Sequence, residues 1–195
     1  MGTLPDMNED VIAAIAVPNY GCDEDVKKYA LALITYEIYQ VTVERTTPVG
    51  ANPVKGVRAF YRPYASTGLI GCTLRGSPDE MDGLLHLAVE SLPINVSEAD
   101  VNLGRTRTIA SFKRPHLETM GDYCDFIGTS YFDQKGLIEE IGKVIVADLE
   151  VTLNATASVA PAVYVIGLTF TFPKLRSLKM VKQSDYYNFI GRFGE

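Results

Sequence analysis

The pattern of hydrophobic and polar positions predicts one well-marked helix in the stretch "GSPDEMDGLLHLAVESL". Ser77 is a good N-cap, Pro78 suits the first helical position, and Glu80 completes a capping box three residues after the cap. At about 100° per residue, the apolar residues fall on one narrow stripe and the polar residues on the opposite side. We therefore predict an amphipathic helix over residues 78–92. Its apolar stripe comprises Met81, Leu84, Leu85, Ala88 and Leu92, and its polar row comprises Asp82, His86 and Glu90.

Alternating or continuous apolar runs predict strands in most of the remaining chain. Residues 29–45, "YALALITYEIYQVTVER", alternate over the longest stretch, although a helix that ends as a strand is also compatible with them. Residues 57–64 and 69–76 suit two strands, with Pro63 restricting the first to an edge or its end. Residues 105–113, "RTRTIASFK", suit another strand. Residues 144–172 predict two apolar strands around a turn of small residues that ends at Pro161.

Three further segments complete the predicted order of elements. Residues 7–16 suit a short helix that ends near Pro18, residues 132–143 suit another, and residues 92–104 suit a loop with one turn capped at Ser97. A chain of 195 residues is long enough for one domain with a substantial core. We therefore predict a single α+β domain, mainly an antiparallel sheet with a few helices. Its expected parts are a mobile acidic arm (1–20), a core (21–172) and a basic, aromatic tail (173–195) that includes a short helix near 185–190.

The cysteines indicate the redox environment. Cys22, Cys72 and Cys124 are odd in number, widely spaced and form no CxxC pair. Reduced thiols in a cytosolic type of compartment are therefore expected. The acidic N-terminus predicts no signal peptide, and no apolar run reaches the roughly 18 residues of a membrane span.

Charge is distributed in blocks of one sign, while the net charge is −6. Residues 1–26 and 79–100 carry acids without Lys or Arg, whereas residues 45–78, 101–117 and 174–183 carry bases without acids. Blocks of opposite sign favour contact between unlike patches, either with a partner or with another copy of the chain. The alternative is that strands happen to carry Arg while helices carry Glu.

Two sets of basic residues are candidates for binding. The first set lies in the tail, where basic and apolar residues alternate in an amphipathic segment. This segment could bind an anionic surface or a partner's groove, or it could dock on the core of its own chain. The second set is interleaved with aromatics and would suit phosphate contacts or stacking. The overall acidity argues against strong direct binding to nucleic acid. The sets are Lys174, Arg176, Lys179 and Lys182, and Arg58, Arg62, Arg105, Arg107, Lys113 and Arg114.

Catalytic motifs are absent from the sequence: it contains no phosphate-binding glycine loop, no nucleophile elbow and no HExxH. We interpret the row of Asp82, His86 and Glu90 as a solvated helix face, and the other histidine, His116, has no marked nucleophile nearby. Acidic neighbours would raise the pKa of the Cys124 thiol, which disfavours a nucleophile. No metal, cofactor or catalytic residue is predicted. A single-domain enzyme or small-ligand binder that uses carboxylates such as Asp122, Asp125 and Asp133 remains an alternative, because carboxylate pairs meet only in three dimensions.

The order of the predicted elements supplies a family resemblance. A pair of strands, the capped helix, the basic strand "RTRTIASFKRP" and two long apolar strands follow one another before a helical tail. Over residues 30–172 this order resembles that of rhabdovirus-type matrix proteins. Two departures are the lack of a proline-rich late-domain motif and the acidic net charge.

That resemblance implies a non-enzymatic, self-assembling viral structural protein of the matrix type, found in the virion. Its expected partners are itself, a nucleoprotein and an anionic membrane surface, contacted through the basic residues. A β-sandwich viral coat subunit is a further alternative, for which the missing basic N-terminal arm is a point against RNA packaging.

Overall fold

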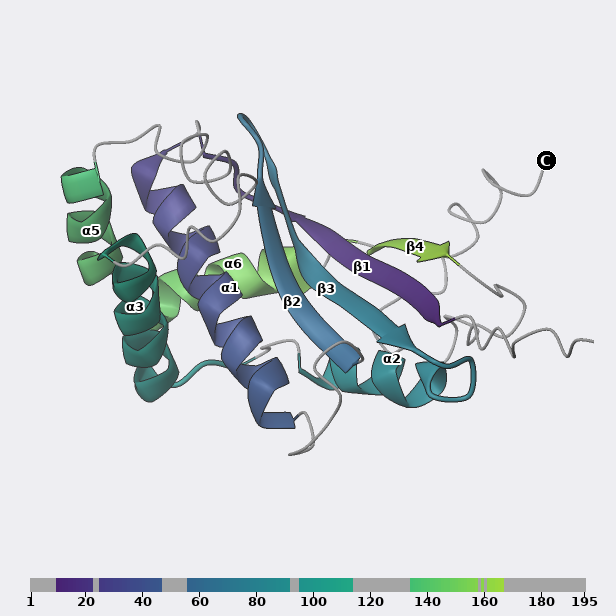
Figure 1. The fold of residues 1–195 in the computed structure, drawn as a ribbon. Coiled ribbons are helices and arrows are strands. Elements are labelled where there is room, and N and C mark those ends of the chain that lie inside the picture. The colour runs from purple at the N-terminus through teal and green to yellow at the C-terminus, as the bar shows by residue number, and fades with distance from the viewer. Residues whose placement is uncertain are drawn as a thin grey trace, which may run out of the picture.

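The computed structural model describes residues 10–22, 25–46, 56–91, 95–113, 134–157, 159 and 161–166. In these ranges it contains four strands and five helices, which form one α+β domain (Figure 1). Each pair of neighbouring strands is antiparallel, in the order β2-β3-β1-β4, so the predicted fold class is confirmed. The strands are β1 (Val11–Asn19), β2 (Gly56–Pro63), β3 (Gly68–Gly76) and β4 (Ala162–Ile166). The helices are α1 (Val26–Thr46), α2 (Met81–Glu90), α3 (Glu98–Lys113), α5 (Gln134–Lys143) and α6 (Val146–Ala157).

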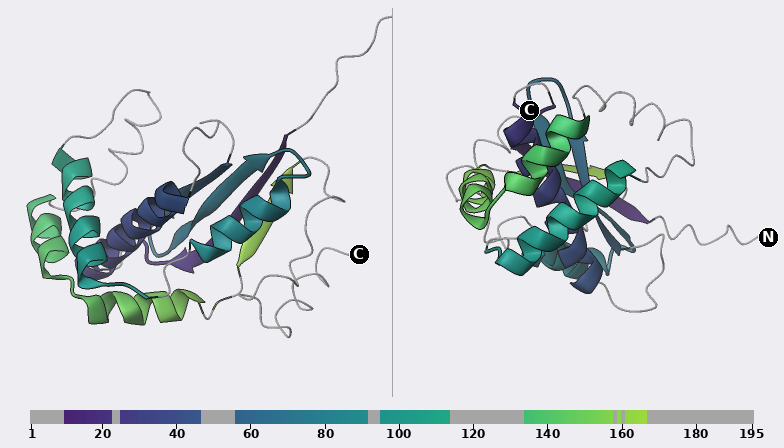
Figure 2. Two further views of the ribbon diagram at one scale, coloured as in Figure 1. Left: turned by 90° about the horizontal axis from the view of Figure 1, so that it is seen from below. Right: turned by 90° about the vertical axis from the view of Figure 1, so that its left-hand side faces the viewer.

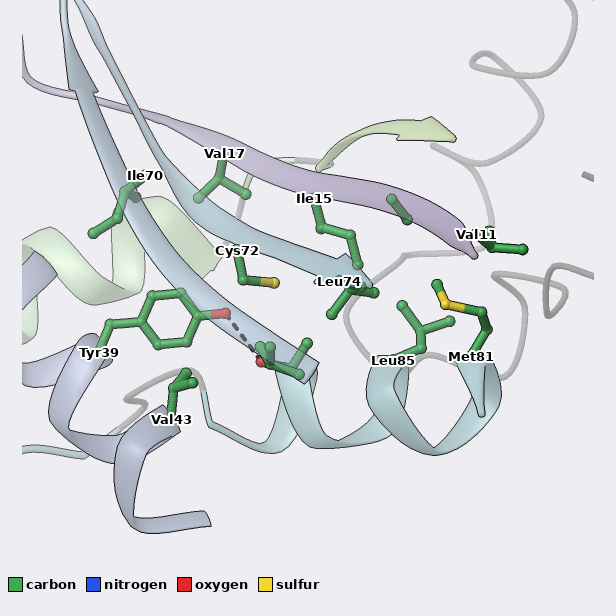
Figure 3. Packing of buried hydrophobic residues seen from close by; sticks show 13 residues of the cluster. Val11, Ile15, Val17, Tyr39, Val43, Ile70, Cys72, Leu74, Met81 and Leu85 are labelled. Carbon is green, nitrogen blue, oxygen red and sulfur yellow. Dashed lines mark hydrogen bonds between the residues drawn. The ribbon is translucent and has the colours of Figure 1, made fainter. Parts of the chain in front are cut away.

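The helix α1 lies between two layers and is buried on two sides (Figures 1 and 2). One side packs with α2 against the sheet, where Tyr39, Leu74 and Met81 belong to the same buried cluster (Figure 3). The Tyr39 hydroxyl donates a hydrogen bond to the Ala88 carbonyl at 3.2 Å, so this polar group is satisfied within the core. The other side of α1 packs against α3, α5 and α6. That second buried cluster includes Ile34, Val101, Ile141 and Leu149.

The prediction for the N-terminal segment is wrong, because residues 11–19 form the strand β1 and not a helix. β1 pairs with β3 on one side and with β4 on the other. A strand inside a sheet has a long apolar run that periodicity alone does not distinguish from a buried helix. Pro18 is tolerated because β4 pairs only with residues 12–16 of β1, so the missing N–H removes no bond to β4. The core therefore begins at β1, within the segment expected to be a mobile arm.

The prediction of a strand over residues 29–45 is also wrong, because α1 covers this whole segment. A helix that is buried on two sides carries apolar residues all round and shows little amphipathic periodicity. Thr35 and Thr42, β-branched residues that favour strands, instead donate their hydroxyls to carbonyls four residues earlier, at 2.8 and 2.9 Å.

Two other predicted strands are helices. Residues 105–113 belong to α3, and residues 146–157 at the start of the apolar segment form α6, while β4 confirms a strand in its second half. The predicted cap at Ser97 is confirmed, since Ser97 and Asp100 bond reciprocally at 3.0 and 3.2 Å, but the helix continues for four turns beyond it. Gly104 lets α3 approach α1 closely: a Cβ there would lie 3.0 Å from side-chain carbons of Ile34 and Ile38.

The local predictions from clear signals are confirmed. β2 and β3 form the expected pair of strands, and α5 forms within the expected residues 132–143. The helix predicted at 78–92 is α2, with a turn over residues 78–80. The Glu80 half of its capping box is present, because the Ser77 N–H donates to Glu80 Oε2 at 2.7 Å, and the Ser77 hydroxyl also donates to this oxygen at 2.9 Å. Met81, Leu85 and Ala88 of the predicted apolar stripe are buried.

Candidate protein-interaction surface on the sheet

The four strands have one face toward α1 and α2 and one face turned away from them (Figure 1). Alternate residues of a strand point to opposite faces, and the strand register places the residues of each face in rows. Val57, Leu74 and Ala13 make one row of the face that packs on the helices. Residues of the opposite parity form the other face, here called the outer face. Its members include Ile12, Ala14, Ala16, Arg58, Phe60, Arg62, Leu69, Gly71, Thr73, Arg75, Ala162 and Tyr164.

Ala14 and Ala16 of β1 and Gly71 of β3 are small residues in the middle of the outer face, and larger side chains lie around them. On the central strands Gly71 lies opposite Ala16. A Cβ at Gly71 would lie 2.0 Å from the Ile15 carbonyl oxygen, so only glycine fits this close approach of β1 and β3. Two of the large hydrophobic side chains are exposed, with 38% of Ile12 and 66% of Tyr164 accessible to solvent. The outer face thus combines apolar groups with a flat centre.

The charged side chains on the strands of the outer face are arginines. Arg58 and Arg62 lie on β2 and are exposed. Arg75 on β3 forms an ion pair with Asp10, at 3.2 Å between Nε and Oδ2. The register places Arg58, Thr73, Ala14 and Tyr164 in one row from β2 to β4. A cationic edge and an aromatic edge therefore lie on either side of a small-residue centre.

The predicted basic residues of α3 lie elsewhere, at the packing of α3 against other helices. Arg107 donates to Glu44 of α1 through both terminal nitrogens, at 2.9 and 3.1 Å, and its Nε lies 3.2 Å from Glu37 Oε2. Arg105 donates to the Val144 carbonyl, which ties α3 to the residue that follows α5. Both arginines thus serve the packing of this fold.

Burial raises the pKa of Glu37 above its usual value, although Arg107 opposes the shift. For Glu44, the hydrogen bond from Arg107 lowers the pKa. The two carboxylates differ because Glu37 is held between α1 and α3 while Glu44 is half exposed.

The remaining basic candidates are not placed by the structure. Lys113 ends α3, and its side chain is not described. Arg114 and the tail residues Lys174, Arg176, Lys179 and Lys182 lie outside the described residues, as does the predicted helix near 185–190. A role of these residues in binding stays a prediction.

Asp82 and His86 of the polar row of α2 are exposed as expected, and the side chain of Glu90 lies outside the described ones. His86 is half exposed, and its Nε2 lies 3.9 Å from Asp82 Oδ2. Across the described ranges, no three His, Cys, Asp or Glu side chains lie close enough to hold a metal ion. His116, Cys124 and the carboxylates of Asp122, Asp125 and Asp133 lie outside those ranges.

The described cysteines are buried free thiols. Burial raises the pKa of Cys72 to about 11, so it is protonated at neutral pH. Its thiol therefore lacks the thiolate character of a nucleophile.

Among the described helices, none combines the length and the apolar character needed to cross a membrane.

Comparison with known proteins gives a likeness of fold. No family model and no curated protein matches this sequence. A chain of complex III2 from Candida albicans, solved with Inz-5 bound, is similar in structure, with a TM-score of 0.67 and 17% sequence identity. The match covers 91% of this chain and 46% of that chain, so this chain spans about half the length of the chain it matches.

This likeness overturns the predicted function. The matching structure is a respiratory complex and not a viral particle, so the prediction of a viral structural protein is wrong. Several elements on which that prediction depended also differ, because residues 29–45, 105–113 and 146–157 are helical.

Arg58 and Arg62 of the outer face were candidates from the sequence, whereas Ile12 and Tyr164 were not. The position of Tyr164 could be predicted, because it alternates with the two valines in "AVYVI" and carries a polar hydroxyl, so its side chain belongs on the opposite face of the strand. For Ile12 the signal was hidden by the helical interpretation of residues 7–16.

Proposed function

We propose that this chain is a protein-assembly domain, and that the outer face of its sheet binds a carboxylate-bearing segment of a partner protein. The observation that carries the proposal is the presence of exposed apolar groups, Ile12 and Tyr164, on the same face as exposed arginines. Tyr and Arg are enriched where proteins bind one another, and acidic groups complement a face whose charged side chains are arginines. The structural neighbour is itself a chain of a multi-subunit complex, which agrees with this class of function.

The size of the outer face favours a segment over a whole globular surface. Four strands about 4.8 Å apart and about seven residues at about 3.3 Å each give roughly 400 Å². A standard interface buries about 800 Å² on each partner, so this face alone supports a weak contact or the docking of one segment. We therefore expect a reversible interaction that depends on few side chains.

Site-specific photo-crosslinking tests the proposal in the cells that make the protein. A photoreactive residue replaces Tyr164 in one variant and Val151, which is 69% exposed on α6, in a control variant. Position 164 should give a discrete crosslinked partner that is lost when Ile12→Asp is added, whereas position 151 should not give that partner. The partner is then purified and titrated, and Ile12→Asp should weaken its Kd at least about tenfold, because a carboxylate replaces a buried apolar contact.

Three results would overturn the proposal. The first is no crosslink from position 164, and the second is a partner whose Kd is unchanged by Ile12→Asp. The third is a crosslink between two copies of this chain. That result would support the homo-oligomer predicted from the charge blocks in place of an acidic partner.

A further inference from the structure

Arg75 of β3 binds a carboxylate of its own chain on the outer face of the sheet. Its Nε donates to Asp10 Oδ2 at 3.2 Å, and Asp10 is the residue that precedes β1. The start of β1 and the end of β3 lie side by side there, with Val11 opposite Gly76 (Figure 1). An acidic side chain of the chain itself thus occupies an arginine of the face to which we assign partner binding.

The neighbours of Arg75 on the outer face leave room for a second group. Ile12 lies directly opposite Arg75 on β1, about 4.8 Å away between strands, and offers an exposed apolar contact. Gly56 lies opposite Arg75 on β2 and carries no side chain, and a Cβ there would meet no atom within 4 Å. A group that approaches Arg75 therefore has open space on one side and an apolar contact on the other.

The ion pair of Arg75 with Asp10 is of a kind that exchanges easily. The Arg75 side chain is 45% exposed and the Asp10 side chain is 22% exposed, and exposed pairs stabilise a fold only weakly because water screens them. Asp10 accepts from Nε, which is one of the two nitrogens that a carboxylate needs for a bidentate pair along the side of the guanidinium. A second carboxylate therefore gains this bidentate geometry only when Asp10 leaves.

We infer that Asp10 is a built-in competitor of the partner's carboxylate, and that Arg75 is the arginine for which the two compete. This inference rests on the proposed function and names the regulation of that site. In the free chain, Asp10 stands in for the partner's carboxylate. When the partner binds, its carboxylate replaces Asp10 on Arg75, while an adjacent apolar side chain covers Ile12. Removal of Asp10 should then tighten binding, because a larger fraction of the free chain is competent to bind.

Nuclear magnetic resonance titration of the full chain tests the inference with a defined peptide. The probe is acetyl-Thr-Leu-Thr-Glu-Thr-Leu-Thr-amide, which carries one carboxylate between two apolar residues and is added to the ¹⁵N-labelled protein. We expect saturable shift changes at the amides around Ile12 and Arg75. The substitution Asp10→Ala should lower the Kd roughly two- to fivefold, which is the range that an exposed ion pair covers. The same peptide with Gln in place of Glu should bind more weakly, and Asp10→Ala should leave its Kd unchanged.

Further variants identify Arg75 as the point of competition. Arg75→Gln should weaken binding of the Glu peptide, and adding Asp10→Ala to it should bring no gain, because Asp10 then has no guanidinium to occupy. Glu140→Ala is the matched control, since it breaks an exposed ion pair with Lys143 on α5 and should leave the Kd unchanged. All of these are surface changes, and the dispersion of the amide spectrum checks that each variant is folded.

Four results with the peptide would overturn the inference. They are no saturable binding of the Glu peptide to the Asp10→Ala protein, a Kd that Asp10→Ala leaves unchanged, a gain that persists in the Arg75→Gln background, and an equal gain with Glu140→Ala.

The partner isolated by crosslinking separates this inference from the proposed function. If Ile12→Asp weakens that partner but Asp10→Ala does not tighten it, the proposed function stands and the inference fails. If neither variant changes its Kd, both fail.

Discussion

The ion group that joins α1 to α3 gives the sharpest prediction of stability. Arg107 contacts Glu44 through two hydrogen bonds and Glu37 through its Nε. The substitution Arg107→Met removes the positive charge and keeps the aliphatic stem, so the loss reports on the ion group more than on packing. The fold is expected to form, with a lower free energy of unfolding.

The magnitude follows from the exposure of the two carboxylates. The Glu44 side chain is 49% exposed, so losing its pair with Arg107 should cost about 0.5 kcal/mol. The Glu37 side chain is only 12% exposed, and a nearly buried carboxylate left without its partner costs about 1–3 kcal/mol. We therefore expect Arg107→Met to lower the free energy of unfolding by about 2 kcal/mol at neutral pH.

The cost should depend on pH in a defined direction. Burial already raises the pKa of Glu37 above 4.5, and Arg107 opposes this shift, so the pKa rises further without Arg107. A raised folded-state pKa means that the charged form is disfavoured in the fold. The free-energy cost of burying the charged Glu37 carboxylate is absent where Glu37 is protonated, and it appears as the pH rises through the folded-state pKa. The difference between wild type and variant should therefore shrink in acid, below the raised pKa, and reach its full size near neutrality.

Urea unfolding at a series of pH values measures this difference. Arg45→Met is the matched control, because Arg45 also links α1 to α3, through an exposed pair with Asp100 at 3.9 Å. It should cost less than about 0.5 kcal/mol. Adding Glu37→Gln to Arg107→Met should recover most of the loss. Equal costs for the two arginine variants, or no recovery with Glu37→Gln, would refute the reasoning.

The remaining predictions concern packing, capping and thiol reactivity. In urea unfolding, Gly104→Ala should lower the free energy of unfolding by about 1 kcal/mol, because the added Cβ crowds α1. Gly83→Ala, where the added Cβ meets open space, should raise it by about 0.5–1 kcal/mol. A change of the same sign in both variants would contradict the packing described. Glu80→Ala should cost about 1 kcal/mol by the same assay, since it breaks the capping box with Ser77, and a neutral result would remove that role. The Cys72 thiol should react with an aromatic disulfide reagent only after urea unfolds the protein, because it is buried and its pKa is raised to about 11. Prompt labelling of Cys72 in the folded chain would disprove its burial.

The sequence predicted those elements whose signals are local. The capping box of Ser77 and Glu80 lies within four residues of chain, and the pair β2–β3 shows alternation bounded by turn residues. Such features need no information about distant parts of the chain. The α+β class and the orientation of α2 followed from them.

The elements that were missed are those whose environment is set by distant segments. α1 is buried by the sheet on one side and by three helices on the other, so its apolar residues show no single face. β1 is apolar throughout because strands pair on both of its sides. In α3, Thr106 and Thr108 suggest a strand, yet their hydroxyls bond to carbonyls four residues earlier, at 2.8 Å each. Tertiary context overrides propensity in each case.

The arginines show why the binding surface could be predicted only in part. Composition marks Arg58 and Arg107 as equivalent members of one basic set, but they lie in different parts of the fold. α1 supplies two acids to Arg107, so that arginine is used within the fold. Arg58 lies instead on the outer face of the sheet, which also carries the exposed apolar side chains of Ile12 and Tyr164. A face with apolar and cationic groups is complemented by a segment with apolar and anionic groups.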